Sequence, residues 1–202
     1  MMVETVYQNE QELLKSVIKI HCPKRIELDP MYFKGNFYKK GLMQPEYIYD
    51  INPQVIFCPR GDATNLPLLS ASIRSIIFDP PFLFEIRNRK NRNYGANTHG
   101  ILKGFQELEK LYKGILKEAY RLLKPKGVLI FKCQDFTDSK TTMTHCLVYN
   151  WAIEQGFYAK DLAILWLPKN KIYNSKLIQR HLRKTHSYFW VFLKQEGGQN
   201  GN

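Results

Sequence analysis

The segment 79–82 places a carboxylate, a stiff backbone and an aromatic ring directly after a short apolar run at 76–78. Proline cannot donate to a sheet ladder and holds the preceding residue extended, so a strand ends here in a rigid turn. The Asp79 carboxylate and the Pro80 carbonyl can each accept a hydrogen from an amino group, while Phe82 stacks on the heterocycle that carries it. Two such acceptors favour a pyramidal nitrogen whose lone pair attacks an electrophilic methyl group, a step that depends on positioning. The residues alone also allow a plain alternative, a strand that ends in an Asp-Pro-Pro turn.

The elements that must position this segment follow from the apolar pattern. Short β-favouring runs predict seven strands, and recurrences at helical spacing predict helices around residues 10–20, 101–123 and 147–152. A turn at residues 31–38, containing Gly35, is expected to run into a further helix. The expected strands are 25–28, 47–49, 55–58, 76–78, 128–131, 162–167 and 188–193.

Acidic residues follow the first four expected strands. Asp29, Asp50 and Asp79 come at the strand ends, and Asp62 follows the third strand after a short turn. Ligands of open α/β sheets bind at the carboxyl ends of the strands, so this pattern predicts a parallel sheet with a binding edge. The last two strands lack a long intervening helix and are expected to pair antiparallel. We expect a single doubly wound α/β domain over residues 1–194 and a disordered tail at 195–202.

Charge indicates the kind of partner. The chain has 30 Lys and Arg against 18 Asp and Glu, a net charge of +12, which favours a polyanion such as nucleic acid. Residues 87–94 and 169–184 are basic, and interleaved cations and an aromatic suit phosphate contact and base stacking. The alternatives are a solvated loop for the first segment and an amphipathic surface helix for the second. The candidate nucleic-acid contacts are Arg87, Arg89, Lys90, Arg92, Tyr94, Arg180, Arg183 and Lys184.

Compartment and metal use follow from the remaining composition. The four cysteines form no CxxC pair and no metal-like pattern with histidine, so we expect reduced thiols and no metal site. No apolar run reaches membrane-spanning length, and the start of the chain is too polar for a signal peptide. The expected location is the cytoplasm, and the sequence predicts no oligomeric state.

The segment Asp79, Pro80, Pro81 and Phe82 resembles the (Asp/Asn/Ser)-Pro-Pro-(Tyr/Phe/Trp) signature of S-adenosylmethionine-dependent methyltransferases that act on exocyclic amino groups. The layout over residues 25–194 is similar to small phage- and prophage-type DNA adenine methyltransferases. The resemblance implies a Rossmann-like class I fold whose seven-stranded sheet is mostly parallel with an antiparallel last strand.

The resemblance also assigns a task to each cofactor residue. Asp29 and Pro30, with the loop through Gly35 and Phe37, would face the methionine part of S-adenosyl-L-methionine. Asp50 would hold the ribose hydroxyls, and Asp62 with Ala63 would meet the adenine. The loop has one glycine where the family pattern is glycine-rich, and residues 34–38 fit the Lys-Gly-x-Phe-Tyr version of small phage-type members. Without the resemblance, each acid is equally an N-cap or turn residue.

The predicted activity is methyl transfer from S-adenosyl-L-methionine to adenine N6 in DNA, with Asp79, Pro80, Pro81 and Phe82 as the catalytic residues. A duplex substrate requires the target base to be flipped out. Two alternatives stay open. One is the same chemistry on cytosine N4 or on RNA, at adenine N6 or guanine N2; the other is a non-catalytic nucleic-acid-binding module.

Overall fold

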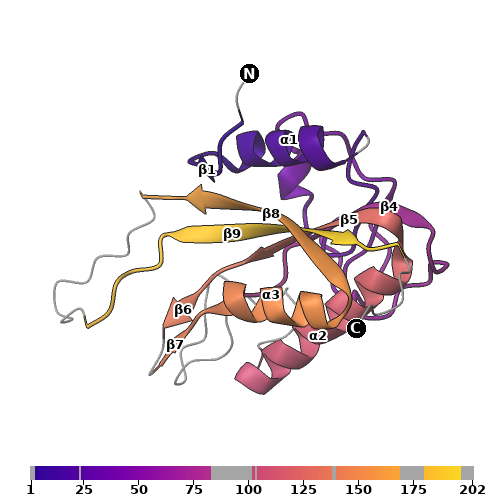
Figure 1. Ribbon diagram of the computed structural model, residues 1–202. Coiled ribbons are helices and arrows are strands. Elements are labelled where there is room, and N and C mark those ends of the chain that lie inside the picture. Colours follow the sequence, from indigo (N-terminus) through magenta and orange to yellow (C-terminus); the bar gives the residue numbers. More distant parts are fainter. Residues whose placement is uncertain are drawn as a thin grey trace.

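The protein is an α/β sandwich built on one seven-stranded sheet, here in a computed structural model that describes residues 3–22, 24–82, 102, 104–137, 140–168 and 180–196. Helix α1 (Glu10–His21) lies on one face, and α2 (Phe105–Leu122) and α3 (Thr144–Glu154) lie on the other (Figure 1). Each face has its own apolar core, one around Leu13 and Leu14 of α1 and the other around Leu108 and Tyr112 of α2. No helix in these ranges is both long and apolar enough to span a membrane.

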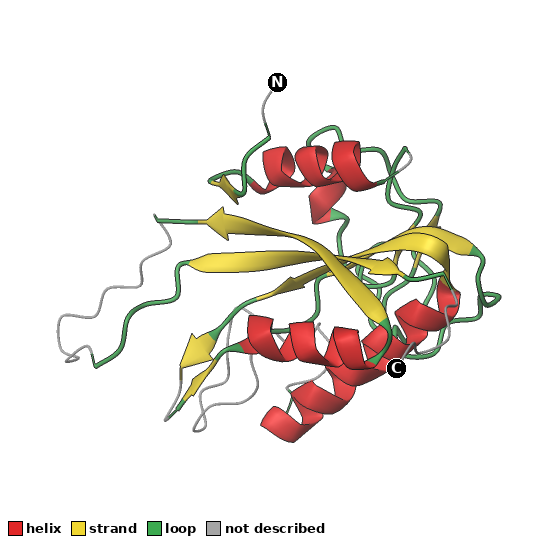
Figure 2. Cartoon of the chain, in the orientation of Figure 1, coloured by secondary structure: helices red, strands yellow, loops and turns green. Residues whose placement is uncertain are grey.

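The strand order confirms the predicted fold class. Strand β9 is antiparallel to both of its neighbours, β8 and β5, and the other pairs in this sheet are parallel. The long arrows of β8 and β9 run in opposite directions in Figure 2. The order is β1 (Val6–Tyr7), β8 (Phe157–Trp166), β9 (His186–Lys194), β5 (Leu123–Cys133), β4 (Ile73–Phe78), β2 (Leu28–Asp29) and β3 (Tyr47–Ile48). A separate hairpin joins β6 (Phe136–Thr137) to β7 (Thr141–Thr142).

Local signals account for the helix ends. The Asn9 side chain caps α1 by accepting from the backbone N–H of Gln11 at 2.9 Å. After α3, Gly156 takes a φ of +99°, a left-handed conformation that glycine adopts without steric cost. The expected helix after Gly35 is one short 3₁₀ turn, η1 (Asn36–Tyr38).

The predicted strand at residues 55–58 is wrong. These residues form a turn in which the Cys58 N–H donates to the Val55 carbonyl at 3.1 Å, and the Ile56 and Phe57 side chains are exposed. Pro53 and Pro59 flank this run and cannot donate to a ladder, so its β-favouring residues have no room to pair. Beyond β3, the structure has an isolated parallel bridge between Asp50 and Arg60. The seventh strand is instead β1, a pair of residues that the sequence pattern did not predict.

The register of β4 and β5 and the alternation of their side chains decide which side chains lie together at their carboxyl ends. Phe78 pairs with Phe131, so Asp79 and Lys132 are the next residues along two adjacent parallel strands. Ile77 and Ile130 belong to the core beneath α1, whereas Phe78 and Phe131 face the opposite core. Because side chains alternate between faces, Asp79 and Lys132 both point toward α1.

Candidate active site

Asp79 lies at the carboxyl edge of the sheet, as the sequence predicted, and has an unexpected partner. Its Oδ2 accepts a hydrogen bond from Lys132 Nζ at 3.0 Å, and its side chain is 30% exposed. Burial raises the pKa of Asp79, and the ammonium of Lys132 opposes that rise. Asp79 Oδ1 has no hydrogen-bond partner among the described residues. One oxygen of the carboxylate is therefore held from within the protein.

Two contacts fix the turn after Asp79. The Tyr112 hydroxyl on α2 donates to the Pro81 carbonyl at 3.0 Å, and Tyr112 is fully buried. The Phe82 ring is 8% exposed and lies with its centroid 5.5 Å from Lys132 Nζ. The stiff Asp-Pro-Pro-Phe turn is thus anchored to the α2 layer by its backbone and to β5 by its ring.

Lys132 is the residue of this site that sequence reasoning missed. Its side chain is 12% exposed, and its Nζ also donates to Glu10 Oε1 at 2.8 Å, in the first turn of α1. The rings of Phe37 and Phe189 have their centroids 5.2 and 5.6 Å from the same nitrogen. In the sequence, the one sign of its role was a lysine directly after the apolar run at 128–131. The structure pairs Phe131 with Phe78, which puts this lysine next to Asp79.

Asp29 is buried behind the loop that follows β2. Its Oδ1 accepts from the Met31 N–H at 3.0 Å, and its Oδ2 accepts from the Tyr38 hydroxyl at 2.8 Å. Burial raises the pKa of Asp29 to about 7, and the charges of Asp79 and Asp50 add to that rise. The three acids thus interact at one edge of the sheet, and Asp29 organises the loop from inside.

Hydrogen bonds with Asp50 and Gln11 hold the loop from Pro30 to Phe37 in place, and one glycine within it makes its turn. Asp50 is buried and accepts from the backbone N–H of Phe33 and of Asn52, each at 2.8 Å. Gly35 has a φ of +63°, and a Cβ there would run into the Tyr32 ring. The Gln11 side chain on α1 donates through Nε2 to the Phe37 carbonyl at 2.7 Å. This single glycine is therefore required by both conformation and packing.

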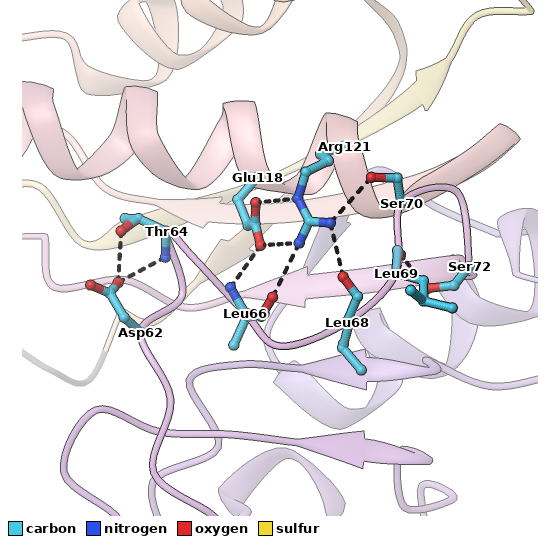
Figure 3. Close-up of polar contacts among 9 residues, drawn as sticks. All are labelled: Asp62, Thr64, Leu66, Leu68, Leu69, Ser70, Ser72, Glu118 and Arg121. Carbon is cyan, nitrogen blue, oxygen red and sulfur yellow. Dashed lines mark hydrogen bonds and ion pairs between the residues drawn. The ribbon is translucent and has the colours of Figure 1, made fainter.

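Asp62 is exposed and caps its own turn, because its Oδ1 accepts from both the backbone N–H and the hydroxyl of Thr64. The chain after it is held by an ion pair on α2, in which Arg121 donates to Glu118 (Figure 3). Arg121 also donates to the carbonyls of Leu66 and Leu68, and Glu118 accepts from the Leu66 N–H at 2.7 Å. Ala63, beside Asp62, is buried.

A second polar cluster lies farther along the same edge, beyond β5. His145 Nδ1 is 2.8 Å from Oδ1 of the buried Asp135, and the His145 ring stacks on Tyr188 with the centroids 4.2 Å apart. Burial and the nearby Asp135 raise the pKa of Tyr188 to about 12. Strand β9 is antiparallel to β5, so its first residues lie at the edge of the sheet where β5 ends. Sequence spacing gives no sign of this cluster.

The candidate nucleic-acid contacts fall into two groups. Arg87, Arg89, Lys90, Arg92 and Tyr94 lie outside the described residues. Arg180 and Arg183 are exposed and Lys184 is partly exposed, just before β9 begins. That end of β9 is at the carboxyl edge of the sheet, so these three cations lie on the same side of the molecule as Asp79.

Comparison with known proteins places the chain in a family. A family model described as DNA methylase matches residues 73–200, a segment that contains Asp79 and Lys132 and is more than half of the chain. The chain belongs to the N6/N4 DNA methylase family. A comparison with curated proteins gives no match.

Two solved structures with TM-scores above 0.5 share this fold. One is a chain in a Haloferax volcanii complex between the Trm112 methyltransferase activator and the putative methyltransferase. It has a TM-score of 0.57 at 11% identity, and the match covers 95% of this chain and 92% of that one. The Burkholderia thailandensis 1,6-didemethyltoxoflavin-N1-methyltransferase has a TM-score of 0.56 at 12% identity, over 94% and 80%. A putative DNA modification methylase from Thermus thermophilus has a TM-score of 0.46 at 19% identity, over 70% of this chain. This chain spans 55% of the length of that protein.

Proposed function

We propose that this protein transfers a methyl group from S-adenosyl-L-methionine to an exocyclic amino nitrogen of a base in DNA, and that the base is adenine, modified at N6. The observation that carries the proposal is the Asp79 carboxylate at the carboxyl edge of the sheet, in a chain of the N6/N4 DNA methylase family. One of its oxygens is held by Lys132, and the other has no partner among the described residues.

The residues around the loop after β2 suit the cofactor. Gln11 Oε1 is buried and has no hydrogen-bond partner in the described part of the chain, directly beside the Phe37 carbonyl. A buried acceptor without a donor is costly, and the ammonium group of the cofactor would satisfy it. Asp50 would hold the ribose, because each of its oxygens keeps a lone pair beyond the backbone bond it accepts. Asp62 would accept from the adenine amino group, and Ala63 beside it would contact the cofactor.

S-adenosyl-L-methionine supplies an electrophilic methyl group on a sulfonium. Asp79 and the Pro80 carbonyl would hold the target amine and direct its lone pair. As the bond from nitrogen to the methyl carbon forms, the methyl–sulfur bond would break and leave a neutral thioether. The amine would give up one proton, for which Asp79 is the nearest acceptor. Phe82, whose ring lies beside Lys132, would stack on the target base. The arrangement lowers the barrier by positioning and by fixed charge.

The test is a methylation assay on defined DNA and RNA oligonucleotides with labelled cofactor, in which mass spectrometry identifies the modified base. We expect N6-methyladenine in DNA. N4-methylcytosine or a modified RNA base would keep the chemistry and change the acceptor. If calorimetry detects no cofactor binding at millimolar S-adenosyl-L-methionine, the proposal fails and the protein is a nucleic-acid-binding module.

A further inference from the structure

Lys132 is a largely buried cation whose presence packing does not explain. Its neighbours include the rings of Phe37, Phe82 and Phe189, so an apolar side chain would also fill this space. Replacing a whole buried ion pair by apolar residues is often neutral or stabilising, so stability alone does not explain why a charged cluster stands here. Its two ionic partners are Asp79, the carboxylate of the proposed transfer, and Glu10 on α1.

The geometry of the three groups is directional. Lys132 Nζ lies 3.0 Å from Asp79 Oδ2 and 2.8 Å from Glu10 Oε1, so the ammonium bridges the two carboxylates. Such charge-assisted bonds restrict the rotation of a carboxylate more than a neutral hydrogen bond does. The Asp79 side chain is therefore oriented by a group on the neighbouring strand, which is in turn oriented by a helix on the face above.

We propose that Lys132 and Glu10 form a positioning pair that sets the direction and the charge of the Asp79 carboxylate. Lys132 occupies Oδ2 and leaves Oδ1 to accept from the target amine, and it keeps the carboxylate ionised in a partly buried site. Glu10 shares the lysine's charge, so that Asp79 remains a strong acceptor. The role in methyl transfer rests on the proposed function, whereas the effect on Asp79 does not.

The surrounding charges predict that removing Lys132 and removing Glu10 change the pKa of Asp79 in opposite directions. Burial raises the pKa of Asp79, Lys132 on β5 lowers it, and Glu10 on α1 raises it. Asp29 at the end of β2 also interacts with Asp79 and stays unchanged in the variants below. Burial lowers the pKa of Lys132, but the two carboxylates outweigh it and the net shift is upward. Removing the lysine must therefore raise the pKa of Asp79, and removing the glutamate must lower it.

The experiment titrates Asp79 by ¹³C NMR of its side-chain carboxyl carbon in the full chain, with the signal assigned through Asp79→Asn. We expect Lys132→Met to raise the pKa of Asp79 by about one unit or more and Glu10→Gln to lower it by a smaller amount. In single-turnover methylation, the acid limb of the rate profile should move in the same two directions. Lys132→Met should slow transfer by about 100-fold while the cofactor Kd changes by less than about threefold.

Lys113→Met is the matched control, because Lys113 is an exposed lysine on α2 that pairs with Glu109. It should leave the titration and the rate unchanged. The proposal is overturned if both test variants leave the Asp79 titration unmoved or shift it in the same direction. Glu10→Gln decides the question by itself if Lys132→Met does not fold. A wild-type protein without methylation activity would refute the proposed function, and the NMR titration would still decide the role of the pair.

Discussion

At the residue scale, the candidate site is defined by how each acid is partnered. Asp79 is bonded to a cation and Asp29 to a phenol and a backbone N–H. The same residue type therefore serves different purposes at one edge of the sheet. Asp29 is a buried organiser of the loop, whereas Asp79 keeps one oxygen without a described partner.

Replacing Asp79 by Ala should abolish methyl transfer and leave cofactor affinity within a few-fold of wild type, because in the proposed mechanism the carboxylate holds the target amine and not the cofactor. Transfer rates and the calorimetric Kd for S-adenosyl-L-methionine measure the two effects separately. Glu109→Ala, which removes an acid from a surface pair on α2, is the control and should change neither. Full activity of the Asp79 variant would defeat the mechanism.

The raised pKa of Asp29 predicts a pH-dependent stability. Between pH 3.8 and about 7, the folded protein binds more protons at this residue than the unfolded chain does, so its contribution to stability falls as the pH rises through that window. Asp29→Asn removes the titration. We expect the free energy of unfolding of the variant, relative to wild type, to improve by at least about 1.4 kcal/mol between pH 5 and pH 8.

Urea unfolding at the two pH values measures this difference. Glu12→Gln, at an exposed acid on α1, is the control. If the difference in the free energy of unfolding between wild type and the Asp29 variant does not change with pH, Asp29 ionises normally in the folded protein.

At the element scale, two helices place the two halves of the site. The first turn of α1 contacts both Lys132 and the Phe37 carbonyl, and so connects β5 to the loop after β2. The last turn of α2 holds the chain at 66–70 through Glu118 and Arg121 (Figure 3). The strands supply the acids, and the helices fix the loops that carry the remaining contacts.

Arg121→Met should destabilise the protein by about 2–3 kcal/mol, because it removes the cation that pairs with the buried Glu118 carboxylate and the donors to two backbone carbonyls. Chemical denaturation measures the change in the free energy of unfolding. Lys117→Met, at an exposed position of the same helix, should cost less than about 0.5 kcal/mol. Equal effects of the two substitutions would show that the Arg121 contacts add nothing to stability.

At the scale of the whole molecule, the net charge of +12 and the location of the site predict where DNA binds. The amino end of β9, where Arg180, Arg183 and Lys184 precede the strand, shares the carboxyl edge of β4 and β5. Lys15 and Lys19 lie along α1 toward its carboxyl end, and Lys24 just precedes β2, so this trio leads to the opposite edge. Charge at the first edge should neutralise phosphates, and charge at the second should not.

Replacing Arg180, Arg183 and Lys184 by Ala should flatten the salt dependence of DNA binding, by about one unit of slope for each phosphate that the protein no longer neutralises. Fluorescence anisotropy over a salt series measures the slope. The triple Ala variant of Lys15, Lys19 and Lys24 has the same change of charge and should leave the slope near that of wild type. Equal slopes for the two variants would assign the effect to net charge alone.

Short-range sequence signals determined the fold class, the three helices and the Asp79 turn, because helical spacing, strand alternation and proline act over a few residues. The same signals failed at residues 55–58, where an apolar run between two prolines forms an exposed turn, and they missed β1, which is two residues long and is defined by its pairing with β8. Only the tertiary structure brought Lys132 to Asp79, 53 residues away in sequence, and Glu10 to the same lysine. That arrangement depends on the register of two parallel strands and on the face that α1 covers, and both are set by long-range packing.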